Sequence, residues 1–122
     1  MKYHESEETY LETIFLLQKK NPHVRSVDIA MELGYSKPSV SVAVKKLVNE
    51  GFITVEAGGS IPLTELGARR AADIYDRHRV ITELLVRIGA NRAVAEETAC
   101  RMEHGVSREL MDVVREFLEQ IF

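Results

Sequence analysis

The chain has 122 residues, which limits it to one compact domain or two small packed subdomains and excludes a large multidomain enzyme. Hydrophobic residues make up 45% and charged residues 29%, with 7 Gly and 3 Pro, a composition typical of a folded globular protein. No apolar run approaches the roughly 20 residues that cross a bilayer, and the N-terminus lacks a signal-peptide core. We therefore expect a cytoplasmic protein without membrane contact.

The net charge of −3 disfavours a general nucleic-acid binder, but the charge is unevenly distributed along the chain. Residues 18–51 carry six basic and three acidic side chains. Residues 1–12 carry one Lys and four Glu, and residues 96–122 carry three Arg and seven acidic side chains. A basic segment between acidic ends is typical of a DNA-facing module joined to a region with another role.

The first helices follow from the spacing of apolar residues. Spacings of three and four predict a helix over 7–18 that ends near Lys20. A short helix over 27–33 follows, with Ser26 as its N-cap and Gly34 as the residue that ends it.

A third helix is predicted over 37–49, with Ser36 as its N-cap and Pro38 in its first turn. Its expected buried side chains are Val40, Val44, Leu47 and Val48. Two helices joined by a short turn, after a longer first helix, are typical of a helix-turn-helix.

A hairpin is predicted next, because the β-formers of 52–55 run into Gly58-Gly59 and are followed by 61–63. A hairpin in this place is the wing of a winged helix. We therefore expect a winged helix-turn-helix DNA-binding domain over 1–63, whose first helix also carries candidate metal ligands.

The second half is expected to be a helical domain over 64–122, so the fold class is mainly α. Thr64 is the expected cap of a long helix to about Ile88, followed by helices over 92–104 and 107–121. The long helix is expected to bury Leu66, Ala71, Ile74, Tyr75, Ile81, Leu84, Leu85 and Ile88. The last two helices carry more apolar residues than three helices can cover, which indicates a homo-oligomer interface.

The outward face of the third helix is the candidate DNA-binding surface. Small hydroxyl side chains and a Pro allow its first turn to enter the major groove, where lysines can reach phosphates. Because those turns lack Arg, Asn and Gln, we expect base discrimination through thymine methyls, Ser hydroxyls and DNA shape. The alternative is a solvated face of a packing module. The candidate DNA-binding residues are Arg25, Ser36, Lys37, Pro38, Ser39, Ser41, Val42, Lys45 and Lys46.

A candidate metal site lies within residues 100–104. Cys100, Glu103 and His104 stand at i, i+3 and i+4, so on a helix their side chains leave one face and can converge on one ion. The alternative is a buried thiol beside a solvated Glu-His pair. The single cysteine cannot form an internal disulfide, so it is a buried thiol, a metal ligand or a redox group. Spacing alone cannot bring the more distant Glu12, His78 and Glu96 to this site.

Four stretches of the chain resemble the diphtheria toxin repressor and manganese transport regulator family. They are Glu8 to Ile14 (Glu-Thr-Tyr-Leu-Glu-Thr-Ile), the helix-turn-helix with Asp28-Ile-Ala and Ser39-Val-Ser, the stretch Asp76-Arg-His-Arg, and Cys100 to Ser107 (Cys-Arg-Met-Glu-His-Gly-Val-Ser). The similarity covers essentially the whole chain. It implies a homodimeric, metal-activated transcription repressor that binds a double-stranded DNA operator and is not an enzyme. The chain looks like the short form, without the SH3-like domain of some relatives.

The resemblance also implies ligands. A principal site would use Cys100, Glu103 and His104, and a second site would use His78, Glu12 and Glu103. Relatives place Asp or Met where this chain has Thr9, so a backbone carbonyl, water or Glu8 would complete the first site. Glu96 matches a position that contributes a histidine in the toxin-repressor branch. A Cys rather than a carboxylate favours Fe(II) as the activating ion, with Mn(II) second.

Three other functions compete with this interpretation. A single-cysteine redox-sensing regulator would use Cys100 as its reactive group, although nearby acids raise a thiol pKa. A small zinc-dependent hydrolase would need an open coordination position and a general base, usually on a larger scaffold. A dimeric interaction module would lack DNA affinity.

Overall fold

The computed structural model describes residues 2–121, and side chains over 7–120. Six helices follow one another in this part of the chain: α1 (Lys2–Lys20), α2 (Ser26–Leu33), α3 (Lys37–Asn49), α4 (Glu65–Arg87), α5 (Arg92–Met102) and α6 (Arg108–Ile121). The expected mainly helical class is therefore confirmed. None of these helices is both long and apolar enough to span a bilayer.

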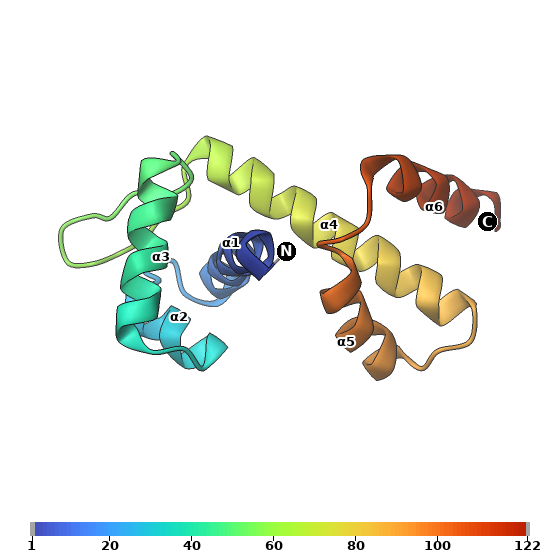
Figure 1. Ribbon diagram of the computed structural model, residues 1–122, viewed down its shortest axis with the longest axis horizontal. Coiled ribbons are helices and arrows are strands. Elements are labelled where there is room, and N and C mark those ends of the chain that lie inside the picture. The colour runs from blue at the N-terminus through green and yellow to red at the C-terminus, as the bar shows by residue number, and fades with distance from the viewer. Residues whose placement is uncertain (1, 122) are drawn as a thin grey trace. The chain divides into compact units, whose positions relative to one another are not determined.

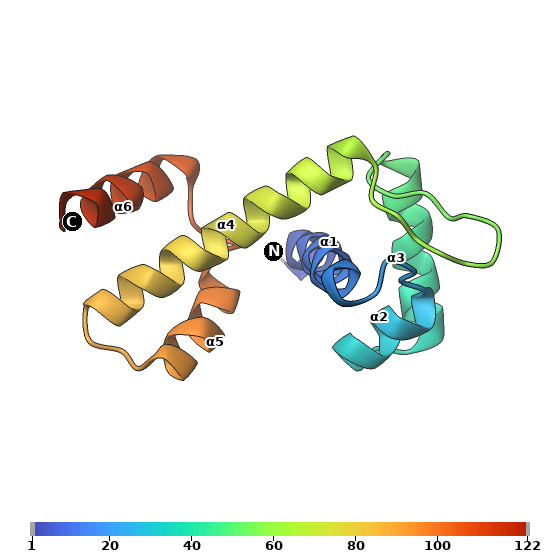
Figure 2. The ribbon, with the colours of Figure 1, turned by 180° about the vertical axis from the view of Figure 1, so that it is seen from behind.

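The chain divides into two compact units between Ala72 and Asp73, and α4 contributes residues to both. In the first unit α1, α2 and α3 pack together (Figures 1 and 2). Their contact is a buried apolar core that includes Leu11, Ile14, Ile29, Val40 and Leu47.

Most helix ends form where the sequence predicts them. The Ser36 side chain accepts a hydrogen bond from the Ser39 amide, and Thr64 Oγ1 accepts one from the Gly67 amide, so both predicted caps are confirmed. Gly34 ends α2 in the left-handed region at φ 70°, which favours glycine. The predicted Ser26 cap is wrong: Arg25 is the N-cap residue, and the Asp28 carboxylate accepts its backbone N–H.

Three residues expected in the core are exposed. Val48 on α3 is 39% exposed, and Leu66 and Ile88, near the two ends of α4, are also exposed. Each lies within two residues of a helix boundary, where fewer neighbouring elements are available to cover the side chain. Apolar spacing alone therefore overestimates burial at helix ends.

The wing is a hairpin without regular strands among the described residues. One antiparallel bridge pairs Ile53 with Leu63, and the Thr54 amide donates to the Pro62 carbonyl. The turn is closed by hydrogen bonds from the Glu56 amide to the Ser60 carbonyl and from the Gly59 amide to the Glu56 carbonyl. The expected hairpin connection is present, but its ladder is short.

The second unit has a smaller core of its own. Ile81 of α4, Ala99 of α5 and Met111 of α6 form a buried cluster. Val80, Leu85 and Val106 pack against it. The α5–α6 turn is therefore attached to α4 through Val106, which places the residues of this turn beside the middle of α4.

Candidate functional site

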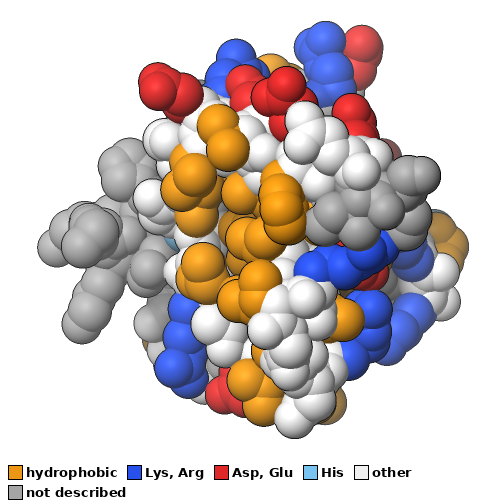
Figure 3. Space-filling model, turned by 90° about the vertical axis from the view of Figure 1, so that its right-hand side faces the viewer, with side chains coloured by type: hydrophobic (Ala, Val, Ile, Leu, Met, Phe, Trp, Pro, Cys, Tyr) orange, Lys and Arg blue, Asp and Glu red, His pale blue; other side chains and the backbone are white. Residues whose placement is uncertain are grey.

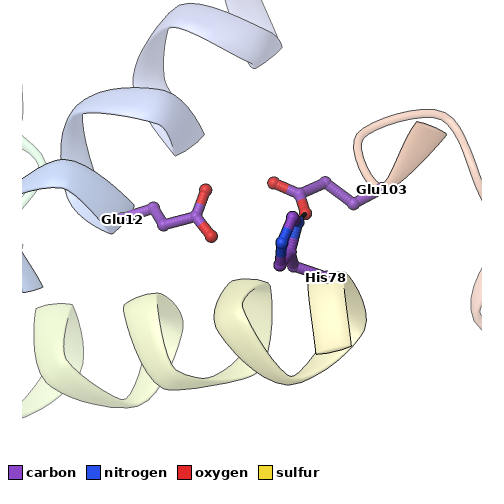
Figure 4. A group of neighbouring side chains, drawn as sticks. All are labelled: Glu12, His78 and Glu103. Atoms are coloured by element: carbon purple, nitrogen blue, oxygen red, sulfur yellow. Dashed lines mark hydrogen bonds and ion pairs between the residues drawn. The ribbon is translucent and has the colours of Figure 1, made fainter. Parts of the chain in front are cut away.

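The centre of the second unit holds a buried carboxylate against a histidine. His78 on α4 donates from Nδ1 to Oε2 of Glu103, the C-cap of α5, over 2.9 Å (Figure 4). Glu103 is only 1% exposed. An ionised carboxylate only accepts hydrogen bonds, so in the neutral form of this ring Nδ1 carries the proton and Nε2 the lone pair. A histidine held in this tautomer is suited to coordinate a cation through Nε2.

The second carboxylate oxygen of Glu103 is buried, and none of the described residues donates a hydrogen bond to it. His104 Nε2 lies 3.5 Å from Oε1, and the His104 side chain is 6% exposed. A buried acceptor without a hydrogen bond costs about 1–3 kcal/mol. An oxygen and imidazole nitrogens in one buried place are donors that divalent transition metals accept, so the residues present fit such an ion.

The turn that follows α5 is fixed to α4 at a second point. Arg77, the neighbour of His78, donates from Nη2 to the carbonyl of Val106. At the near end of the turn the Glu103 amide donates to the Ala99 carbonyl, and at the far end Ser107 caps α6. Glu103 and His104 are therefore held by backbone contacts on both sides. Sequence reasoning missed Arg77, whose only signal is its place next to His78.

Cys100 is open to solvent, whereas the side chains of Glu103 and His104 are buried. It is exposed on α5, so the alternative of a buried thiol is wrong, while a metal ligand or a redox group stays open. The helix ends at Met102 and not at His104, because Glu103 and His104 belong to the turn that follows. Glu96, one turn earlier on α5, is exposed as well. The structure thus brings His78, Glu103 and His104 together, with Cys100 at the solvent-facing side of α5.

The candidate ligands of the first unit are on α1. Glu8 is buried and forms an ion pair of 2.7 Å with Arg70 at the start of α4. Because Arg70 binds one oxygen of the Glu8 carboxylate, that oxygen is less available as a metal ligand. Glu12, one turn further along α1, is buried, and Thr9 is half-buried.

Two acidic side chains of the first unit, Glu7 and Glu50, interact with each other. Burial raises the pKa of the Glu7 carboxyl above its ordinary value of 4.5, and a hydrogen bond with Glu50 and the Glu50 charge raise it further. Lys46 and Arg70 act in the opposite direction. Glu7 is therefore protonated more readily in the folded chain than in an unfolded one.

The candidate DNA-binding surface is open to solvent. All nine residues expected to contact DNA are exposed, and Val42, in the middle of the outward face of α3, is 69% exposed. One of them has a protein partner: Arg25 donates from Nη2 to the carbonyl of Gly58 in the wing. Beside α3 lies a cavity of about 670 Å³ lined by Tyr10, Tyr35, Val42 and Lys46 among others. The candidate DNA-binding surface is therefore concave next to Val42.

The second unit also has an uncovered apolar face. Hydrophobic side chains gather on the side of the molecule shown in Figure 3. On α6, Leu110, Val113 and Phe117 recur at helical spacing and are exposed, whereas Met111 and Val114 on the adjacent face are buried. The apolar stripe of α6 is thus wider than the contact it makes within its own unit. Among the described residues of this unit, the exposed large hydrophobic side chains are Ile88, Val94, Met102, Leu110, Val113 and Phe117.

Comparisons with known proteins agree across both units. Residues 2–59 match the family model described as iron dependent repressor, N-terminal DNA binding domain. Residues 64–121 match the model described as iron dependent repressor, metal binding and dimerisation domain.

Similar whole proteins are named as transcription regulators. An uncharacterized HTH-type transcriptional regulator of Methanocaldococcus jannaschii is 34% identical over 95% of this chain and 94% of its own length. The transcriptional regulator MntR of Salmonella typhimurium is 33% identical over 91% of this chain and 71% of its own. The crystal structure of the metal-dependent transcriptional regulator MtsR superposes with a TM-score of 0.85 at 27% identity. That match covers 93% of this chain and 53% of the MtsR chain, so this chain spans about half of its length.

Proposed function

Because this chain belongs to the iron-dependent repressor family of metal-dependent transcription regulators, we propose that it is a repressor that a divalent metal ion activates for operator binding. The observation that carries the proposal is the buried Glu103 carboxylate, which has one oxygen on His78 and the other without a hydrogen bond from any described residue. A cation would satisfy that oxygen and offset the cost of burying it.

The proposed ligands are Glu12, His78, Cys100, Glu103 and His104. His78, Glu103 and His104 are supported by their mutual distances in the second unit. Glu12 and Cys100 are supported by their match to the family's ligand positions, and Glu12 also by its burial. We place Thr9, Glu8 and Glu96 second, because Thr9 offers only a hydroxyl, Glu8 already pairs with Arg70, and Glu96 is exposed.

Fe(II) is our first choice for the activating ion, and Mn(II) our second. A thiolate from Cys100 would add a soft donor to a set of carboxylates and imidazoles, and soft donors favour later metals over Mn(II). The ion supplies positive charge that neutralises neighbouring carboxylates. Relatives named for either metal resemble this chain: the iron-dependent repressor IdeR of Mycobacterium tuberculosis at 33% identity, and a manganese-dependent transcriptional repressor in complex with manganese at 28%.

The proposed operator contacts are made by α3 and the wing. Ser36, Ser39 and Ser41 present hydroxyls, Lys45 and Lys46 present charges, and all are exposed. Val42 offers an apolar contact for a thymine methyl, which suits an interface without bidentate base readers. We expect two such units to act together in a homodimer formed through the apolar face of α6.

Metal activation follows from charge in this proposal. If Glu12 and Glu103 came together without an ion, their negative charges would repel, so in this proposal the ion is what favours docking of α1 on the second unit. In the proposal, docking α1 there fixes the distance between the two α3 helices of a dimer. These helices must contact DNA half-sites about 34 Å apart. Fixing this distance before binding removes an entropic cost, and by linkage DNA then tightens metal binding by the same factor.

The experiment is operator binding by the metal-free protein, measured anaerobically by fluorescence anisotropy across a Mn(II), Fe(II), Co(II) and Zn(II) series. We expect at least a roughly tenfold gain in operator affinity with saturating ion, the largest gain with Fe(II). Operator affinity that no ion changes would contradict metal activation. A gain that peroxide abolishes and thiol restores would instead favour the redox-sensing alternative, since Cys100 is exposed.

A further inference from the structure

Arg25 makes a contact that local sequence patterns do not predict. Its Nη2 donates to the carbonyl of Gly58 over 2.6 Å, across 33 residues of sequence. A side chain at the next residue, Gly59, would meet Arg25 Nε as its nearest atom, at 3.8 Å. The guanidinium therefore lies against both glycines at the tip of the wing.

The backbone of Arg25 is itself well fixed. Its N–H donates to the Asp28 carboxylate over 2.9 Å at the start of α2. The residue before it, Val24, is buried, and its carbonyl accepts the Ile61 amide over 2.8 Å. The Ile61 carbonyl in turn accepts a hydrogen bond from Gln18 of α1. The base of the wing is thus tied to the helical core at the same place from which Arg25 reaches its tip.

The wing needs such support because its own bonding is sparse. Residues 54–58 are all exposed, and the described part of the hairpin has the single bridge between Ile53 and Leu63. A two-stranded hairpin of this kind is marginally stable in water. A charged donor on the Gly58 carbonyl limits the positions that the tip can take, and the fixed fork of a guanidinium does this better than a lysine ammonium.

We propose that Arg25 is a positioning residue for DNA binding: it holds the wing tip at a fixed place relative to α2 and α3 before the operator arrives. In this role its contribution to affinity comes through the wing and not through a phosphate contact of its own. The importance of the wing for DNA rests on the proposed repressor function. The contact between Arg25 and the wing does not.

The first test needs no DNA. Amide hydrogen exchange is measured by NMR on the full chain for the wild type, Arg25→Lys and Arg25→Met. We expect the Glu56 and Gly59 amides to exchange at least about tenfold faster in both variants. The amides of Val44 and Leu47, in the buried part of α3, should keep their wild-type rates and so report that the unit is folded. Lys45→Met is the matched control, a basic residue exposed on α3 whose removal should leave the wing amides unchanged.

The second test is operator binding by the metal-loaded protein at several salt concentrations. We expect Arg25→Lys and Arg25→Met each to lower affinity about tenfold while leaving the slope of log K against log salt unchanged, since in the positioning role Arg25 neutralises no phosphate. Lys45→Met should reduce that slope by about 0.9, the value for one phosphate that is no longer neutralised. A lysine at position 25 that preserves wild-type affinity would overturn the positioning role.

The two tests fail separately. Wing amides that exchange at the wild-type rate in both Arg25 variants would overturn the contact, whatever the operator data show. A wild-type chain that binds no operator with any ion would contradict the proposed function, and the exchange rates would still decide whether Arg25 holds the wing.

Discussion

His78 Nδ1 and Glu103 Oε2 lie 2.9 Å apart, although 25 residues separate them in sequence. The histidine fixes one oxygen of the carboxylate and leaves the other buried without a donor from the described residues. The described residues therefore supply a hydrogen bond to only one of the two Glu103 oxygens. Glu103 is therefore the first residue to substitute in a test of metal binding.

Glu103→Gln should weaken divalent-metal binding about 100-fold or more, because the amide cannot neutralise a cation and the Gln loses one acceptor oxygen. The measurement is a Co(II) titration followed by absorption, with circular dichroism as the check of folding. Glu97→Gln is the matched control, since Glu97 is an exposed residue of α5 paired with Arg101 at 3.5 Å. Equal Co(II) affinity in both variants would remove Glu103 from the ligand set.

Cys100→Ser should change metal selectivity more than it changes folding, because Cys100 is exposed and contributes little to the core. We expect the variant to lose Fe(II) and Zn(II) affinity relative to Mn(II), since a hydroxyl is a harder and weaker donor than a thiolate. Competition between Zn(II) and Mn(II) in one titration measures this ratio directly. An unchanged ratio would show that Cys100 is not a ligand.

Gly67→Ala should destabilise the first unit by about 1–3 kcal/mol. A Cβ at this position would overlap the Phe52 carbonyl oxygen, so α4 could not approach the start of the wing so closely. Urea unfolding measures the change in the free energy of unfolding. The control is Gly105→Ala, where the nearest atom to the new Cβ is 3.9 Å away and little change is expected.

Glu7→Gln should stabilise the first unit at pH 7 and have little effect near pH 4. The pKa of Glu7 is raised in the folded chain by burial and by Glu50, so its stabilising contribution is present below about pH 4.5 and is lost as the pH rises through the folded pKa. The substitution removes this loss. The expected gain in the free energy of unfolding at pH 7 is less than about 1 kcal/mol, because the group is partly solvated. Urea unfolding at both pH values tests the sign.

Glu50→Gln provides the companion measurement for Glu7, since it removes the other member of the pair. It should stabilise the unit at pH 7 in the same direction. The double variant should gain less than the sum of the two single variants, because both relieve the same repulsion. Additive gains would mean that the two carboxyls do not interact.

Phe117→Asp should weaken the proposed dimer at least about 100-fold, because it places a charge on the exposed apolar face of α6. Sedimentation velocity over a range of protein concentrations measures the change. Glu116→Ala, at the exposed neighbouring position, should leave the association unchanged. Operator affinity should fall with the dimer in Phe117→Asp, and a fully dimeric variant would place the interface elsewhere.

Much of the fold could be predicted because it depends on local signals. Ser36, Gly34 and Thr64 act on residues three or four positions away, so a cap or a helix end can be identified from a few neighbouring residues. The cap of α2 was placed at Ser26 because Ser is a preferred N-cap residue and Arg is not, although the Asp28 carboxylate that accepts the Arg25 backbone N–H is only three residues away.

The candidate site was only partly predictable, since its contacts join distant residues. The spacing of Cys100, Glu103 and His104 predicted one helix face, whereas Glu103 and His104 lie in the turn after α5, and nothing local ties that turn to His78 or Arg77. The Glu8 carboxylate pairs with Arg70, which lies 62 residues away in sequence. Long-range partners of charged side chains follow from the packing of helices, which spacing does not specify.

The sparse pairing of the wing has a consequence for how copies of this protein meet. Sheet edges recruit other chains through rows of unsatisfied backbone groups, and a hairpin with one bridge among its described residues offers no such row. Fibril-like growth from this hairpin is therefore disfavoured. The proposed dimer through α6 would instead depend on side-chain contacts between helices, which pairing of two copies saturates.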